Sequence, residues 1–417
     1  MPAITSGLLS DARVLAAYFI FAGSYLVFAL GKFPWMKIDR PGAAIIGAVL
    51  MVAFGIVGGG EALASVDFAT VVLLFAMMLI AGSLRLAGFF TWITDWMIER
   101  LHPKHLLPTV IFTSGLLSAF LVNDIVCLVM VPFVVHVARV LRRPPLPYVI
   151  AVATASNIGS TATITGNPQN MLIGSLSGIS YAAFLSRLAP VAVMGLFINW
   201  ALIHRLYLRG EIDHVAVAPA LAAPELQQGR IRKKPIVVLV FVLAGLLAGV
   251  PPAMTAAVGA AVLLITRTME PRRLYAEVDW GLLVFFVGLF IIVGGAERVG
   301  LTARLLEPIN AWNLHRIPVF VGSTAVLSNI VSNVPAAMLL RTVVPGFPDP
   351  RLGWMALAMA STLAGNLTIT GSVANIIVVE RAAAEGVHVG FREYFRVGAP
   401  LTVATLVAGS LWLWATS

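Results

Sequence analysis

The sequence is poor in charged residues, which make up 11% of its 417 residues. Soluble domains contain about 25% charged residues, so this composition excludes an ordinary soluble globular protein. Hydrophobic residues make up 59% of the chain, and they are gathered into runs of the length that crosses a membrane. The sequence therefore predicts an all-α protein that crosses the bilayer many times.

Cysteine and nucleotide-binding motifs are also lacking. Cys127 is the one cysteine, which excludes an internal disulfide and a cysteine-rich metal site. Gly31-Lys32 continues into Phe33 and therefore lacks the pattern of a P-loop. The sequence argues against ATP hydrolysis by this chain, although an ATPase partner is left open. The seven histidines are scattered, so we expect no metal, no cofactor and no enzymatic activity.

Apolar runs divide the chain into two similar halves joined by a polar linker. Residues 1–205 and 235–417 each contain five predicted spans, and residues 206–234 form the linker. Each half also has one apolar run interrupted by polar residues, at 106–137 and at 317–344, which we interpret as re-entrant hairpins. An odd number of crossings inverts the second half relative to the first, as in the repeats of secondary transporters. The predicted spans are 12–31, 41–58, 68–87, 146–175, 183–205, 235–249, 252–268, 280–298, 353–379 and 396–416.

One span in each half is polar and broken. The first, within 146–175, contains ATASNIGSTATITGNPQNMLIG, without any Asp, Glu, Lys or Arg. The second, within 353–379, contains STLAGNLTITGSVAN and repeats the TITG motif after a shift of about 205 residues. An unpaired backbone group in hydrocarbon costs several kcal/mol, so a broken helix at membrane depth needs a wet or protein-lined cavity. Such helices bind the solute in secondary transporters.

The distribution of basic residues predicts the orientation. If the linker lies in the cytoplasm, most of the 28 Lys and Arg residues fall on the cytoplasmic side, as the positive-inside rule requires. Both termini then lie outside, in a bacterial plasma (inner) membrane. The net charge of +9 reports this topology and does not indicate nucleic-acid binding. The opposite side keeps Arg13, Arg187, Arg298, Arg304, Arg316, Arg341 and Arg351.

At these motifs the chain resembles the ion transporter superfamily, and within it the arsenite-efflux permeases and silicon-efflux transporters. The resemblance is carried by Val122-Asn123-Asp124 with the segment 127–132, and by the segments 155–160 and 165–170. It implies inverted repeats, a homodimer held by a scaffold part, and an elevator-like movement of the part that holds hairpins and broken helices. The superfamily also includes citrate-transporter-like proteins and the divalent-anion/sodium symporters.

The residues of the hairpin tips favour protons over sodium as the coupling ion. In the sodium symporters both tips carry a Ser-Asn-Thr type motif. Here the tips are Val122-Asn123-Asp124 and Ser332-Asn333-Val334, and both lack the threonine. A carboxylate at membrane depth costs roughly 2.5 kcal/mol or more, so Asp124 is expected to take and release a proton as its cavity changes. The alternative is that Asp124 caps a half-helix at the headgroup level.

The candidate solute-binding residues are the polar and glycine residues of the two tips and the two breaks. Their amides and hydroxyls can both donate and accept hydrogen bonds. The alternative is that they only repair the helix ends, as membrane threonines often do. The predicted set is Asn123, Thr161, Thr165, Gly166, Asn167, Asn170, Asn333, Thr370, Gly371 and Asn375.

The same segments indicate the charge of the solute. They contain no Lys or Arg, so a multivalent anion would depend on backbone N–H groups and helix N-termini alone. A neutral polyhydroxy solute such as arsenous or silicic acid fits more easily. We predict proton-coupled efflux of arsenite or a similar hydroxylated metalloid. The alternatives are a sodium- or proton-coupled permease for inorganic anions or carboxylates, and a sodium/proton antiporter.

Overall fold

The computed structural model describes residues 2–33, 37–93, 103–208, 232–266, 269–302, 304–305 and 313–416. Within these ranges the chain is almost entirely helical, and the one sheet is the short pairing of β1 (Lys32–Phe33) with β2 (Ile38–Asp39). Six of the described helices are long and apolar enough to cross a membrane. The predicted all-α membrane fold is therefore confirmed. Most of the predicted linker, 206–234, lies outside the described residues.

In the described part of the first half there are ten helices, and the long ones overlap the predicted spans. They are α1 (Pro2–Leu30), α2 (Arg40–Ala53), α3 (Gly59–Ser65), α4 (Phe68–Leu86), α6 (Leu106–Phe120), α7 (Asn123–Val140), α8 (Leu146–Ser160), the short helix η2 (Ile164–Gly166), α9 (Pro168–Ser177) and α10 (Tyr181–Ile203). Two further short turns are η1 (Pro103–His105) and η3 (His204–Leu208).

The second half repeats this order of helices. They are α11 (Lys233–Leu247), α12 (Pro252–Ile265), α13 (Pro271–Tyr275), α14 (Trp280–Arg298), α16 (Ile317–Val331), α17 (Asn333–Leu340), α18 (Pro350–Ala364), the short helix η5 (Ile369–Gly371), α19 (Val373–Ala384) and α20 (Phe391–Ala415), with a further short turn at η4 (Val344–Gly346).

Equivalent helices of the two halves begin in the same way. Asp67 precedes α4 and its carboxylate accepts from the Ala69 N–H at 3.1 Å. Asp279 precedes α14 and accepts from the Leu282 N–H at 2.9 Å. The backbone angles agree, with φ −78° and ψ 90° at Asp67 and φ −77° and ψ 87° at Asp279. An acceptor here satisfies N–H groups that the first turn leaves free, so Asp67 and Asp279 act as equivalent helix caps in the two halves.

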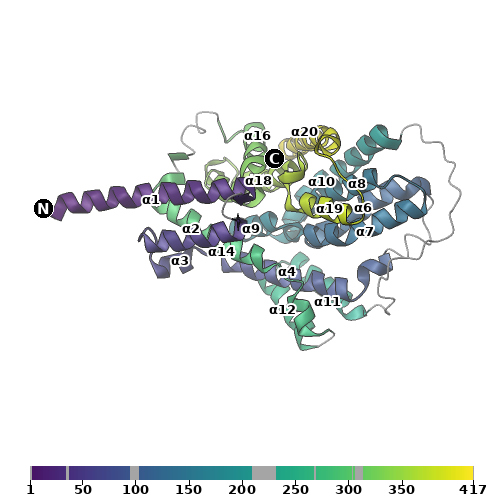
Figure 1. Ribbon diagram of the computed structural model, residues 1–417, viewed down its shortest axis with the longest axis horizontal. Helices are drawn as coiled ribbons and strands as arrows, with labels where there is room; N and C mark the ends of the chain where they lie inside the picture. The colour runs from purple at the N-terminus through teal and green to yellow at the C-terminus, as the bar shows by residue number, and fades with distance from the viewer. Residues whose placement is uncertain are drawn as a thin grey trace.

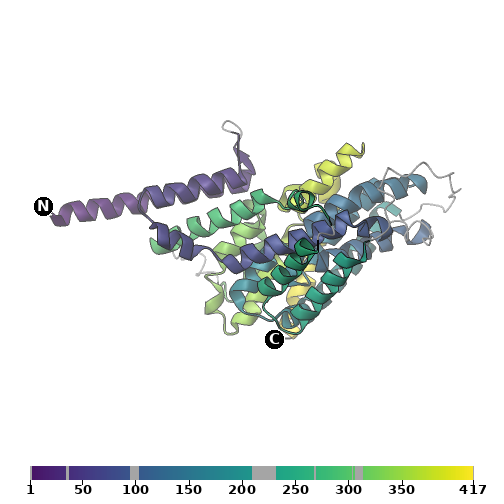
Figure 2. The ribbon, with the colours of Figure 1, turned by 90° about the horizontal axis from the view of Figure 1, so that it is seen from below.

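The helices form two packed groups, which Figure 1 and Figure 2 show from two sides. The framework group contains α1–α4 and α11–α14, in which α2 packs on α14 and α4 packs on α12. The broken-helix group contains α6–α10 and α16–α20, in which α6 packs on α8 and α16 packs on α18. In both views α1 runs out beyond the rest of the molecule, away from α6, α7 and α8. Each group takes equivalent helices from both halves.

Small residues bring the framework helices together. A Cβ on Gly288 of α14 would collide with the backbone of Ala44 on α2, and a Cβ on Gly47 would meet Ser24 and Ile292. Membrane helices associate through such close backbone approach because lipid offers no hydrophobic driving force between them. The glycine-rich, apolar composition of these spans therefore builds a tightly packed framework.

Candidate functional site

The first break lies between α8 and α9 and is closed by two asparagines. The amide nitrogen of Asn170 donates to the carbonyl oxygens of Ser160 and Thr163, both at 3.0 Å. The Asn167 side chain accepts from the Asn170 backbone N–H at 2.8 Å and so caps α9. These bonds satisfy backbone groups that the interrupted helix leaves free, as membrane depth requires.

The second break, between α18 and α19, is closed in the same way. Asn375 donates to the carbonyl oxygens of Gly365 and Thr368 at 2.7 and 3.0 Å. The backbone at Thr368 has φ −135° and ψ 163°, and that at Thr163 has φ −136° and ψ 162°. The repeated TITG motif therefore folds into the same break twice.

Asn157 of α8 joins the two breaks and the first hairpin tip. Its amide nitrogen donates to the Oδ1 atoms of Asn366 and Asn375, both at 2.9 Å. Its Oδ1 accepts from Asn123 Nδ2 at 3.3 Å and from Ser372 Oγ at 3.1 Å. All five side chains are buried. The amide of Asn157 is thus fully used in holding the halves together, because a primary amide has two donors and two acceptor sites.

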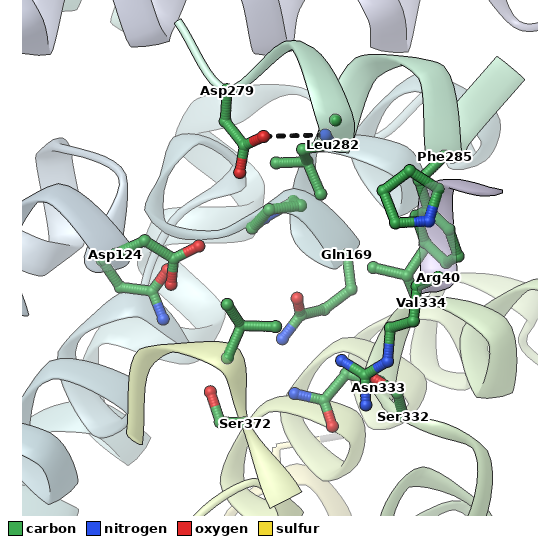
Figure 3. Close-up of a pocket in the computed structure, with 15 residues that line it drawn as sticks. Arg40, Asp124, Gln169, Asp279, Leu282, Phe285, Ser332, Asn333, Val334 and Ser372 are labelled. Carbon is green, nitrogen blue, oxygen red and sulfur yellow. Dashed lines mark hydrogen bonds between the residues drawn. The ribbon is translucent and has the colours of Figure 1, made fainter. Parts of the chain in front are cut away.

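A cavity of about 180 Å³ lies beside this network, where the framework group meets the broken-helix group. Figure 3 shows Asp124 on one side, Asn333 and Arg40 on the other, and Gln169 between them. Its walls are formed by the two hairpin tips and by the N-termini of α9, α19, α2 and α14. The lining residues are Arg40, Pro41, Asn123, Asp124, Pro168, Gln169, Asp279, Gly281, Leu282, Phe285, Ser332, Asn333, Val334, Ser372 and Val373.

Three charged side chains line the cavity. Arg40 donates from Nε to the carbonyl oxygen of Phe28 at 3.0 Å, which anchors the guanidinium at the end of α1. Asp279 caps α14 through Leu282. The carboxylate of Asp124 receives no hydrogen bond or ion pair from the residues that the structure describes. Asp124 is therefore available to a solute or a proton.

The second hairpin tip carries strained backbone at the cavity. Ser332 has φ 78° and ψ 159°, a region that non-glycine residues rarely occupy. The next residue, Asn333, is buried, and with its amide nitrogen turned toward the break it donates to the carbonyl oxygens of Ser361 and Gly371 at 3.1 and 3.2 Å. Strain of about 1–3 kcal/mol persists only where the surroundings hold it, and it gathers at binding sites.

The structure separates the predicted solute-binding residues into two sets. Asn123 and Asn333 line the cavity, together with Asp124, the residue predicted to couple transport to protons. The other predicted residues close the breaks, and a direct role in binding stays a prediction for them. Thr161 donates to the Asn157 carbonyl, Thr165 bonds the Tyr181 hydroxyl, Asn167 and Asn170 close the first break, and Asn375 closes the second. Gly166 packs on the Ser160 backbone and Gly371 on that of Gly365, while Thr370 is exposed and bonds Thr368.

The prediction did not include five polar or charged residues of the cavity lining, namely Arg40, Gln169, Asp279, Ser332 and Ser372. Gln169 and Ser372 flank the breaks and could have been found from that position. Arg40 and Asp279 precede spans of the framework group, and only tertiary packing brings them to the hairpin tips.

Comparisons with known proteins identify the family. Residues 25–350 match the profile of the citrate transporter family. The silicon efflux transporter LSI3 of Oryza sativa subsp. japonica is 29% identical over 95% of this chain and 97% of its own length. The putative transporter arsB of Dictyostelium discoideum is 25% identical over 90% of this chain and 87% of its own.

A solved transporter shares the fold. The YdaH transporter of Alcanivorax borkumensis superposes with a TM-score of 0.57, covers 98% of both chains and is 16% identical. The chain is a multi-pass membrane protein and a secondary transporter, and it belongs to the citrate transporter family.

Proposed function

We propose that this transporter exports a small hydroxylated metalloid, arsenite first, in exchange for protons that bind Asp124. The observation that carries the proposal is the cavity of about 180 Å³ at the two hairpin tips, in which hydrogen-bonding side chains surround a carboxylate that has no partner among the described residues. The proposal includes two inverted repeats in a bacterial inner membrane with both termini outside, as the basic residues predict.

The polar lining supports a hydroxylated solute. Asn123, Gln169 and Asn333 contribute amides, while Ser332 and Ser372 contribute hydroxyls. Amides and hydroxyls both donate and accept, which matches a solute whose hydroxyl groups do the same. A water occupies about 30 Å³ of liquid, so the cavity has room for a solute of a few heavy atoms with some water.

Asp124 supports the coupling to protons. Asp124 lines the cavity (Figure 3). It lies in the first turn of α7, a helix of the broken-helix group. Because an ionised carboxylate is costly at membrane depth, loss of solvent during a transport step favours its protonated form. Solute and proton can therefore occupy the cavity alternately, which is what exchange requires.

Unequal packing of equivalent helices supports alternating access. In the described chain α4 packs against α9, whereas their counterparts α14 and α19 make at most a marginal contact. The cavity reaches the N-termini of α2 and α14, the ends that the predicted topology puts in the cytoplasm. We propose that this is the cytoplasm-facing state, and that movement of the broken-helix group against the framework group opens the other face.

A permease for a small anion or carboxylate is the second candidate, and Arg40 favours it. The sequence argument for a neutral solute relied on the absence of basic residues from tips and breaks. Packing adds Arg40 to the cavity wall from outside those segments. A guanidinium binds carboxylate or oxyanion oxygens well, so a singly charged solute is also compatible with this cavity.

Transport in liposomes tests the proposal. Purified protein would be offered arsenite, silicate, phosphate, sulfate or citrate under an imposed proton gradient, with and without sodium. We expect arsenite or silicate to move without sodium, and Asp124→Asn to lose proton-driven transport while Asp124→Glu keeps part of it. Asp349→Asn is the control, because Asp349 caps α18 outside the cavity and asparagine caps equally well.

Each other outcome contradicts a defined part of the proposal. Sodium-dependent movement of a charged anion alone would support the second candidate. Exchange of sodium for protons with no solute would indicate an antiporter. Normal proton-driven transport by Asp124→Asn would exclude Asp124 as the coupling residue.

A further inference from the structure

We infer that Arg40 binds the cargo on only one face of the membrane and so gives the transporter a high-affinity side. This inference depends on the proposed function insofar as it requires a transported solute in the cavity. It does not depend on which solute that is.

Arg40 is held in position to bind oxygen atoms in the cavity. Its Nε donates to the Phe28 carbonyl, which leaves the terminal nitrogens of the guanidinium for other partners. Figure 3 shows this end of the side chain beside Asn333, across the cavity from Asp124. A solute between them can meet the donors of Arg40 at one end and the carboxylate at the other. Among the described lining residues Arg40 is the one basic side chain.

Arg40 and the hairpin tips belong to different groups of helices. Arg40 begins α2 of the framework group, and Asn333 begins α17 of the broken-helix group. If the two groups move against each other during transport, cargo carried by the tips leaves Arg40 behind. Arg40 then contributes to binding in this state and not in the opposite one.

The repeat shows what stands at the opposite face. The shift along the chain that carries Asp67 onto Asp279, and α4 onto α14, carries the first residue of α2 onto the first residue of α12. These residues are Arg40 and Pro252, and both helices are 14 residues long. The carboxylate is therefore present in both halves, whereas the guanidinium is replaced by a proline that has no side-chain donor.

This asymmetry has a consequence for transport. A charge-assisted hydrogen bond contributes about 1.5–3 kcal/mol, which corresponds to about tenfold to a hundredfold in affinity. The cargo is bound more tightly where Arg40 lines the cavity. We expect it to be released more readily at the opposite face, where the repeat places Pro252. With the predicted topology the tight face is cytoplasmic, which suits capture inside and release outside.

The test is the KM of transport measured separately from each face in proteoliposomes of known orientation. Arg40→Gln removes the positive charge and the guanidinium donors. Arg40→Lys keeps the positive charge but lacks the planar guanidinium with its paired N–H donors. Lys37→Gln is the matched control, because Lys37 is an exposed basic residue just before β2, three residues from Arg40 in the sequence, and it lies outside the cavity lining. The solute is whichever of arsenite, silicate, phosphate, sulfate and citrate the wild-type protein moves.

We expect Arg40→Gln to raise KM about tenfold to a hundredfold from the Arg40 face and less than about threefold from the other. Arg40→Lys should fall between wild type and Arg40→Gln, and Lys37→Gln should match wild type. An unchanged KM, or an equal rise from both faces, would overturn the inference. An equal rise with a lower melting temperature would instead assign Arg40 a structural role through Phe28.

The failure of the inference can be told apart from failure of the proposed function. If the wild type moves citrate and not arsenite, the proposed function is wrong, and the comparison of the two faces still tests Arg40 with citrate. If Arg40→Gln does not insert into the membrane, the KM values of Arg40→Lys are measured from the two faces instead. A rise in KM from the Arg40 face alone then supports the inference.

Discussion

Asn157 on α8 and Asn375 on α19 are joined by a hydrogen bond of 2.9 Å although they are 218 residues apart in the chain. The bond links the broken helices of the two halves directly. Because Asn157 also bonds Asn366, Asn123 and Ser372, a single side chain connects both breaks with the first hairpin tip.

Removal of this amide is expected to weaken the fold. Asn157→Leu keeps the approximate volume but leaves four buried partners without their bond, and one unsatisfied buried group costs about 1–3 kcal/mol. We expect destabilisation of at least about 2 kcal/mol, measured as a lower thermal midpoint of the purified protein. Ser186→Ala is the control, because the Ser186 hydroxyl is exposed and bonds only within its own turn. Equal melting of Asn157→Leu and wild type would contradict a structural role.

Gly159 is expected to tolerate no side chain. It lies in α8 where a Cβ would collide with the backbone of Gly115 on α6, and a backbone obstacle cannot rotate away. Gly159→Ala should separate the first hairpin from the broken helix and cost about 1–3 kcal/mol or more. Yield and monodispersity after detergent extraction measure this loss.

The control for this prediction is a helical glycine with open space around it. Gly322 of α16 has no atom within 4 Å of an added Cβ, so Gly322→Ala should be neutral or slightly stabilising through helix propensity. Equal yield and monodispersity of the two variants would show that α6 and α8 pack less tightly than in this structure.

The ion pair between Glu297 and Arg341 is expected to couple the two groups of helices. Arg341 Nη2 lies 2.7 Å from Glu297 Oε1, and the side chains are 22% and 32% exposed. It joins the end of α14 in the framework group to the end of α17 in the broken-helix group. A double-mutant cycle with Glu297→Gln and Arg341→Gln should give a coupling energy near 1 kcal/mol, the upper end of the range for ion pairs in contact with solvent.

A matched pair gives the baseline for this measurement. Arg273 and Glu270 are 3.4 Å apart, 68% and 70% exposed, and close in sequence, so their coupling should be about 0.3 kcal/mol or less. A Glu297–Arg341 coupling no larger than this baseline would mean that the pair does not hold the two groups together.

Glu61 is expected to make stability depend on pH in the acid range. Its carboxylate accepts from the Gly58 N–H at 2.8 Å and pairs with Arg298 at 2.6 Å, and the Gly58 bond followed by Arg298 lowers the pKa of Glu61 below its usual 4.5. A group with a lowered folded-state pKa stabilises the fold above its unfolded pKa, and this contribution is lost as pH falls through the folded value.

The comparison with Glu61→Gln isolates this contribution. The thermal midpoint of wild type should exceed that of the variant at neutral pH, and the difference should shrink as pH falls below 4.5. Glu380→Gln, which removes an exposed carboxylate from α19, controls for the loss of one negative charge. A difference that grows toward acid pH would contradict the sign of the effect.

Local patterns in the sequence predicted the helices and the breaks. Bounds such as 68–87 for α4 and 280–298 for α14 agree closely with the structure, because a membrane forces each segment to satisfy its own backbone. The TITG motifs marked both breaks for the same reason, since a helix that stops at this depth needs polar residues to bond its free groups.

The sequence by itself determined that the chain is a helical membrane protein, and it predicted two similar halves with Asn123, Asp124 and Asn333 at hairpin tips. Only the tertiary structure decided which residues share the cavity. Arg40 and Asp279 reach the tips because α2 packs on α14, and Asn157 finds Asn375 because the halves interlock. Contacts between distant segments depend on close packing in three dimensions, which leaves no periodic signal along the chain.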